Sequence, residues 1–159
     1  MEKVMISKTA LFILLAFAIF CCKKGEDENP DHIKYGISFR ICNDYCVHEI
    51  TITGKTITYT DSPWEDNPDN LSPVQCSFSF SDSLFNDLKT KIDPSQFQTL
   101  PETYGCPDCQ GNGSEWVMIK IGEIEHKVTF EYQNEPDPLR NYIDKLRDYF
   151  DRYNDCQGS

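Results

Sequence analysis

A single apolar run near the N-terminus decides in which compartment this chain folds. The run covers residues 10–22 and is 13 residues long, whereas a membrane-spanning helix needs roughly 18 or more. Its length suits the apolar core of a signal peptide, about 7–15 residues. Lys3 and Lys8 are the basic residues that precede such a core, and a polar segment begins at Lys23. We therefore expect residues 1–21 to be a signal peptide.

Two processing sites fit this leader. Residues 16–18 (AFA) have the small-x-small pattern of ordinary signal cleavage, which would release a soluble secreted protein. The residues up to Cys22, with apolar Ile19 and small Cys21 before it, instead resemble a bacterial lipoprotein signal. That resemblance implies an acylated Cys22 and a protein anchored in the outer membrane of the cell envelope, on its surface or its periplasmic face.

The residues after Cys22 form a polar tether that we place at 22–33. Its acidic stretch, residues 26–28 (EDE), resembles the export signal of surface lipoproteins in some Gram-negative bacteria. A solvated linker is the simpler interpretation of the same residues. The partner that this part of the chain implies is the membrane, reached through the lipid.

The charge of the chain excludes one class of partner. Removing the leader takes Glu2, Lys3 and Lys8 from a chain of net charge −11, which leaves −12. Binding to phosphate backbones requires basic surface, so we expect no nucleic-acid partner. About 138 residues remain, enough for one domain, and we place it at residues 34–156.

Six cysteines follow Cys22, an even number in a chain directed to an oxidising compartment. They allow 15 disulfide pairings, and sequence does not choose among them. The pairing that we expect closes two short loops and one long one: Cys42–Cys46, Cys106–Cys109 and Cys76–Cys156.

Alternation of apolar and polar residues predicts β-strands. The first segment places Ile37, Phe39 and Ile41 on one face. The predicted strands are residues 34–42, 46–53, 56–60, 74–80, 116–121 and 124–132.

Two helices are expected after these strands. Ser81 is a candidate N-cap, and four apolar residues share one helical face before Pro94: Leu84, Phe85, Leu88 and Ile92. Asp137-Pro138 marks the start of a second helix that continues to Tyr153. This order predicts an α+β fold, an antiparallel sheet of about five to six strands with two helices packed on one face.

Two cysteine motifs are candidates for chemistry. Residues 106–113 (CPDCQGNG) resemble one copy of the zinc-binding repeat of DnaJ-type chaperones, but a tetrahedral site needs four thiolates. A structural disulfide, a zinc site shared with Cys42 and Cys46, and thiol exchange are the alternatives. A redox-active C-x-x-C normally begins a helix, whereas this one lies in a glycine-rich loop.

The second motif is Cys42-x-x-x-Cys46 between two predicted strands. With the leader and the order of strands and helices, it resembles a family of uncharacterised bacterial secreted and lipid-anchored proteins over residues 34–153. In that family a proline follows the second cysteine, where this chain has Val47. The resemblance implies no known activity.

Other candidate residues have simple interpretations. His48 and His126 lie in the apolar phase of their strands, as hydrogen-bonded half-buried histidines or as metal ligands. Trp64 lies in an acidic loop and is a candidate contact for a partner or a sugar. No nucleophile elbow, phosphate loop or His-Glu-x-x-His pattern is present.

We therefore expect a non-catalytic binding module without metal or cofactor, which contacts an envelope protein or an extracellular ligand. A metal-binding or thiol-redox module and an enzyme acting on envelope polymers are the alternatives.

Overall fold

The computed structural model describes residues 30–64, 71–154 and 156. The predicted signal peptide, the predicted lipidation residue Cys22 and most of the predicted tether lie outside these residues. The sheet begins at His32, two residues before the predicted start of the domain at residue 34. His32 and Ile33 therefore belong to the first strand and not to the tether, and Ile33 is fully buried.

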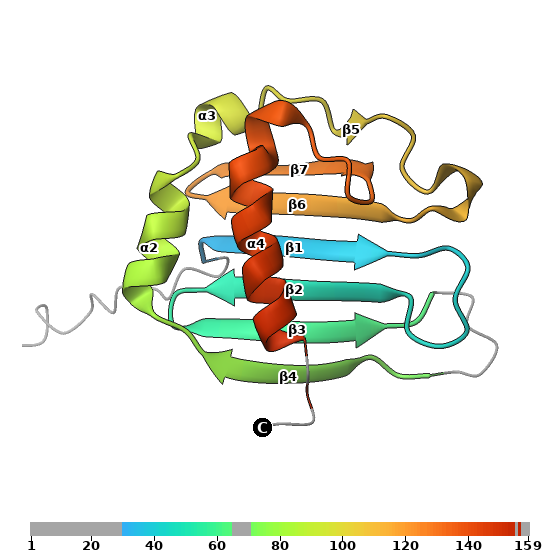
Figure 1. Cartoon of the computed structure of the whole chain (residues 1–159). Coiled ribbons are helices and arrows are strands. Elements are labelled where there is room, and N and C mark those ends of the chain that lie inside the picture. Colours follow the sequence, from blue (N-terminus) through green and yellow to red (C-terminus); the bar gives the residue numbers. More distant parts are fainter. Residues whose placement is uncertain (1–29, 65–70, 155, 157–159) are drawn as a thin grey trace, which may run out of the picture.

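Seven strands form one sheet in the order β4-β3-β2-β1-β6-β7-β5 (Figure 1). Neighbouring strands are antiparallel, except that β5 pairs with β7 in parallel. The predicted antiparallel α+β class is right, and the predicted five to six strands are one too few. The strands are β1 His32–Ser38, β2 Val47–Thr53, β3 Thr56–Ser62, β4 Val74–Ser79, β5 Thr103–Tyr104, β6 Ser114–Ile121 and β7 Ile124–Glu131.

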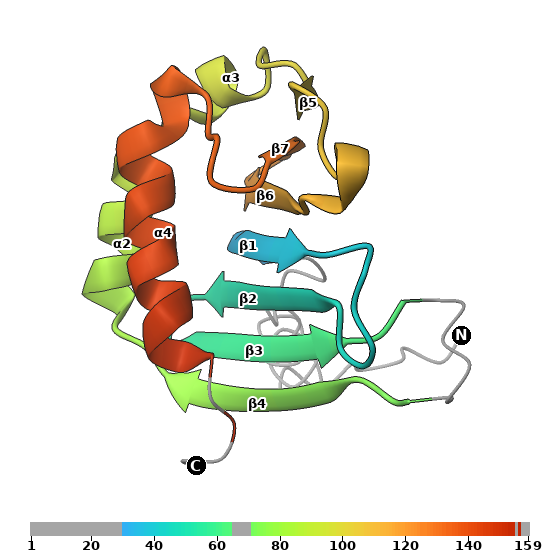
Figure 2. The same ribbon diagram turned by 45° about the vertical axis from the view of Figure 1, so that its right-hand side comes forward.

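Helices α2 (Asp82–Thr90) and α4 (Arg140–Tyr153) cover the same face of the sheet (Figure 2). A third, short helix, α3 (Pro94–Phe97), was not expected. The sequence predicted that Pro94 ends the first helix, but α2 ends earlier and Pro94 is the first residue of α3. Proline suits this position because its missing N–H has no helical acceptor there.

The core lies between α4 and the middle of the sheet. α4 follows a short 3-10 helix, Asp137–Leu139, and its inward residues pack on the central strands. The ring of Phe150 contacts Tyr35 and Tyr59 edge to face, at centroid distances of 5.5 and 5.8 Å. The buried residues of α4 are Tyr142, Ile143, Leu146, Tyr149 and Phe150.

Two apolar residues that were predicted to face the core are exposed. Ile41 is 81 % exposed because β1 ends at Ser38 and the chain then turns into a loop. Leu84 is 38 % exposed at the first turn of α2, whereas Phe85 and Leu88 are buried. Period-two and period-3.6 patterns place residues on a face but do not show where an element ends.

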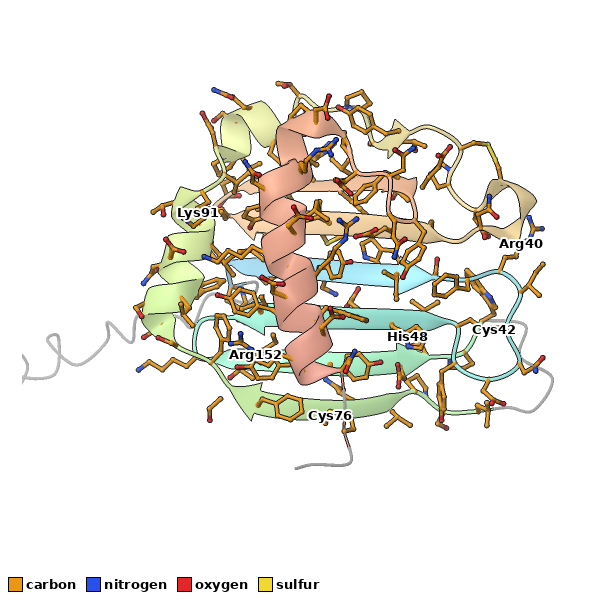
Figure 3. The ribbon with its side chains drawn as sticks, viewed as in Figure 1. Arg40, Cys42, His48, Cys76, Lys91 and Arg152 are labelled. Carbon is orange, nitrogen blue, oxygen red and sulfur yellow. A yellow bond between two sulfur atoms is a disulfide. The ribbon has the colours of Figure 1, made fainter. Side chains whose placement is uncertain are left out.

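The six cysteines of the domain lie in three disulfide-compatible pairs: Cys42–Cys46, Cys76–Cys156 and Cys106–Cys109, with Cα atoms 5.7, 5.6 and 5.4 Å apart. The long-range pair joins edge strand β4 to the segment after α4 (Figure 3, Cys76 labelled). Beside it Phe78 packs on Tyr153, with ring centroids 5.4 Å apart. The edge of the sheet is thus fixed to the C-terminal helix.

Candidate functional site

Three connections leave the sheet at the same end, at the right of Figure 1. They are the β1–β2 loop (residues 39–46), the β3–β4 connection, of which residues 63–64 and 71–73 are described, and the β5–β6 loop (residues 105–113). Two of the three contain a short-range cysteine pair. The opposite end of the sheet contains the tight turns and α2.

The β1–β2 loop is closed on itself and bound to the β3–β4 connection. The N–H of Phe39 donates to the carbonyl of Cys46 at 2.9 Å, beside the Cys42–Cys46 pair. Trp64 Nε1 donates to the carbonyl of Phe39 at 3.1 Å, and the hydroxyl of Tyr45 donates to the carbonyl of Ser72 at 3.2 Å. Both loops therefore hold one arrangement relative to each other.

The β5–β6 loop packs on the other side of the β1–β2 loop. Phe39 also contacts Tyr132, the residue after β7, edge to face at 5.1 Å. A Cβ at Gly113 would lie 2.7 Å from the Phe39 ring, and one at Gly111 would lie 2.9 Å from Ile41. Both glycines also have positive φ, so other residues would be strained there. The close approach of these loops requires glycine.

Large apolar side chains are exposed on this end of the sheet. Among the described residues four large hydrophobic side chains are exposed, and three of them lie here: Ile41 (81 %), Trp64 (39 %) and Val74 (41 %). The fourth, Leu84, lies on α2 at the opposite end. We call the group of Ile41, Trp64 and Val74 the loop-end surface. It contains Trp64, which the sequence predicted as a partner contact.

A polar cluster lies at the base of the loop-end surface, on the helix-covered face. Asp61 Oδ1 accepts from the hydroxyl of Tyr59 at 2.5 Å and lies 2.5 Å from Nδ1 of His48. Burial and the bond to Asp61 raise the pKa of Tyr59 well above its usual value. Strand register places Ile37, His48, Asp61 and Val74 opposite one another in a single row. Figure 3 shows His48 beside the Cys42 loop.

A His–Asp pair can act as a general base when a nucleophile is bonded to the other ring nitrogen of the histidine. In the part of the chain that the structure describes, no hydroxyl or thiol is bonded to the other ring nitrogen of His48. His126, the second histidine, donates from Nε2 to the carbonyl of Leu100 at 2.9 Å. β1 and β6 lie between the strands of the two histidines, so the two rings are not brought together.

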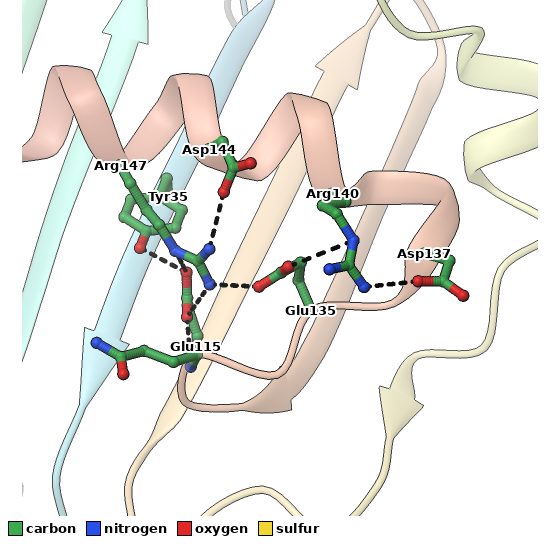
Figure 4. Close-up of polar contacts among 8 residues, drawn as sticks. Tyr35, Glu115, Glu135, Asp137, Arg140, Asp144 and Arg147 are labelled. Carbon is green, nitrogen blue, oxygen red and sulfur yellow. Dashed lines mark hydrogen bonds and ion pairs between the residues drawn. The ribbon is translucent and has the colours of Figure 1, made fainter.

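The strongest electrostatic network stabilises the fold and was not predicted. Glu115 on β6 is fully buried and accepts from Arg147 on α4, from the hydroxyl of Tyr35 at 2.6 Å and from the N–H of Gln133 at 3.0 Å (Figure 4). Glu135 accepts a further bond from Arg147 at 2.7 Å. Burial and the charge of Glu115 raise the pKa of Tyr35. Both carboxylate oxygens of Glu115 accept hydrogen bonds, as in a structural ion pair.

One hollow of about 390 Å³ lies beside β7 and is lined mainly by polar and charged side chains, whereas ligand pockets are mostly apolar. Its residues are Glu102, Thr103, Met118, Glu125, His126, Lys127 and Thr129. The one histidine among them is already bonded to a backbone carbonyl.

The thiol-based alternatives find little support. The four cysteines are paired two by two, Cys42 with Cys46 and Cys106 with Cys109, and do not converge on one point. Within residues 30–64, 71–154 and 156, no three His, Cys, Asp or Glu side chains converge to hold a metal ion. The zinc site predicted from Cys42, Cys46, Cys106 and Cys109 is therefore not built there.

The acidic loop predicted around Trp64 is also different in the structure. Asp61 lies in β3 and not in the loop, and the remaining acidic residues lie outside the described residues: Glu65, Asp66 and Asp69.

Comparison with known proteins adds no identification. The sequence matches no protein-family model, and no curated protein is significantly similar to it. None of the helices in the described residues is both long enough and apolar enough to cross a membrane.

Proposed function

We propose that this chain is a lipid-anchored protein of a bacterial cell envelope whose folded domain binds another envelope protein, or an extracellular one, through the loop-end surface. The leader, with Cys22 at its end, supports the anchor. Three disulfide-compatible cysteine pairs support folding outside the cytoplasm, because such pairs persist in oxidising compartments. The domain itself is non-catalytic.

One observation carries the binding proposal: three exposed apolar side chains lie at one end of the sheet, two of them on loops joined by hydrogen bonds and the third, Val74, at the start of β4. Exposed aromatic and aliphatic residues are frequent anchors of protein interfaces, and prior ordering of a loop lowers the entropy cost of binding. Ile41 lies in the loop after β1, directly before the Cys42–Cys46 pair. Trp64 is held by its hydrogen bond to the carbonyl of Phe39. The surface thus presents apolar anchors that do not have to be ordered on binding.

The anchor is tested by Cys22→Ser in cells, with Cys21→Ser as the matched control. The Cys22 variant should move from the membrane fraction to the soluble fraction, because it lacks the acylated thiol, and the Cys21 variant should stay. Retention of the Cys22 variant in the membrane contradicts lipidation.

The surface is tested by a photo-reactive amino acid at position 41 in the full chain on intact cells, with position 84 as the control. Leu84 suits this purpose because it is the exposed large apolar side chain of the described residues that lies at the opposite end of the sheet. An adduct of defined mass should form from position 41, disappear with Trp64→Ala, and be absent from position 84. Equal labelling from both positions would mean that the loop-end surface is not a specific contact.

A further inference from the structure

Among the described residues, β4 is a sheet edge without the features that normally prevent strands from pairing. It is the outermost strand beyond β3, and Figure 1 shows no labelled element on its outer side. The sequence of β4, VQCSFS, contains no charge and no proline. Natural edge strands are usually interrupted by lysine, proline or a bulge, or are covered by a loop or helix.

The outward hydrogen-bonding groups of β4 can be identified. The N–H of Phe80, the residue after the strand, donates to the carbonyl of Lys55 at 2.7 Å, so Phe80 is directed toward β3. Successive residues of a strand alternate in direction, and the residues of opposite phase therefore direct N–H and C=O away from the sheet. These are Gln75, Ser77 and Ser79; all three are exposed, and none has a partner on its outer side among the described residues.

β4 is also fixed to the helix that covers one face of the sheet. The Cys76–Cys156 pair and the contact of Phe78 with Tyr153 fix β4 to the C-terminal helix. A fixed strand loses little conformational entropy when another strand pairs with it. The free edge is therefore a preformed template.

We propose that β4 pairs with β4 of a second copy of this chain, antiparallel and centred on Ser77. In a two-fold contact residues meet symmetry mates, so a charged edge strand would bring like charges together. β4 avoids this because all six of its residues are uncharged. Centring on Ser77 pairs Ser77 with itself and Gln75 with Ser79, which satisfies the outward groups of all three.

The interface is small, and the two copies repel each other through their net negative charge. The association is accordingly weak in dilute solution, strengthens with salt, and is promoted when copies share one surface. It uses other residues than the loop-end surface: the outward groups of β4 belong to Gln75, Ser77 and Ser79, whereas that surface includes only the first residue of the strand, Val74.

Cysteine cross-linking of the full chain in its membrane tests this pairing. Opposite residues that exchange both backbone bonds have Cα atoms about 5.5 Å apart, within the range that a disulfide spans. Ser77→Cys should give several-fold more dimer on oxidation than Ser83→Cys, an exposed position on α2. Co-expressed Gln75→Cys and Ser79→Cys chains should cross-link to each other, whereas Gln75→Cys alone should not exceed the Ser83→Cys control.

Ser77→Pro provides the loss-of-function arm. Its N–H points outward, so proline removes a donor from the edge without removing a bond to β3. The substitution should abolish the cross-link between Gln75→Cys and Ser79→Cys chains. It should leave the unfolding temperature nearly unchanged, and so should the control Ser83→Pro in the first turn of α2. If Ser77→Pro does not fold, Ser77→Lys replaces it. Ser77→Lys should weaken the cross-link between Gln75→Cys and Ser79→Cys chains, and the weakening should be smaller at high salt.

Three results overturn the proposal: equal dimer from positions 77 and 83, a cross-link between two Gln75→Cys chains as strong as the mixed one, or an adduct at position 77 with a different protein and no dimer.

Discussion

Arg147 on α4 and Glu115 on β6 are joined by two hydrogen bonds, from Nε to Oε1 at 2.8 Å and from Nη2 to Oε2 at 2.9 Å. Glu115 is fully buried, so its carboxylate depends on this guanidinium for its counter-charge. Arg147→Leu leaves that charge uncompensated and should lower the free energy of unfolding by about 3–5 kcal/mol. Urea unfolding with the disulfides intact measures the change.

Arg140→Leu is the matched control for that experiment. Arg140 lies two turns earlier on the same helix and pairs with Asp137, but it is 57 % exposed. An exposed pair contributes about 0–1 kcal/mol. Similar losses in the two variants would contradict a special role for the buried carboxylate.

Two buried tyrosines should respond in opposite ways to removal of the hydroxyl. Tyr35 donates to Glu115, so Tyr35→Phe removes a bond to a charged group and should cost about 1.5–3 kcal/mol. The hydroxyl of Tyr142 is buried without a hydrogen-bond partner among the described residues. Tyr142→Phe should therefore leave the free energy of unfolding unchanged or raise it by about 1 kcal/mol. A large loss in Tyr142→Phe would show that the hydroxyl has a partner.

The three cysteine pairs should differ in their contribution to stability. Cys76 and Cys156 are 80 residues apart in sequence, whereas the other pairs are separated by 4 and 3 residues. In the chain-entropy account, a loop of this length contributes about 4 kcal/mol and the short ones about 2 kcal/mol. The Cys76→Ser, Cys156→Ser double variant should thus be the least stable of the three double variants. Thermal unfolding of all three gives the order, and an equal loss in each would contradict it.

Acid should destabilise the domain through carboxylates that are hydrogen-bonded or ion-paired in the fold. Hydrogen bonds from Asn134 and from the N–H of Cys106 lower the pKa of Glu131. Burial opposes ionisation of Glu135, but its bonds to Arg147 outweigh that effect, and its pKa is also lowered. A carboxyl group with a lowered folded pKa stabilises the fold above its unfolded pKa and loses this contribution as pH falls through the folded pKa.

The unfolding temperature should therefore fall as pH is lowered from about 5 to about 3. Glu131→Gln and Glu135→Gln should each reduce the slope in this window, since each removes one titrating group. A slope that stays the same in both variants would assign the acid sensitivity to other carboxylates.

Much of the fold could be predicted from the sequence because its strands alternate cleanly and α4 has a regular apolar face. The predicted strands do not include β5 at Thr103–Tyr104, because a two-residue strand has no period to detect. Ile41 continued the alternation of β1 beyond its end. Period alone did not show that the backbone turns after Ser38.

The candidate site was less accessible to sequence reasoning. Trp64 was identified by its residue type, but Ile41 became part of the loop-end surface only when three loops were placed together. Glu115 lay just before the predicted strand 116–121, and nothing near it in sequence marked it out, because its partner Arg147 lies 32 residues away. A pairing at that distance is visible only in three dimensions.

β1 is the first strand of the described chain and lies in the middle of the sheet, with β2 on one side and β6 on the other. If the chain is anchored through Cys22 as proposed, a mechanical load from that side reaches β1 before any other described element. β1 moves along its own axis only if its hydrogen bonds to both neighbours shear together. The N-terminal side of the described chain thus enters the sheet where extension meets the most resistance, and an edge strand in its place would peel away one bond at a time.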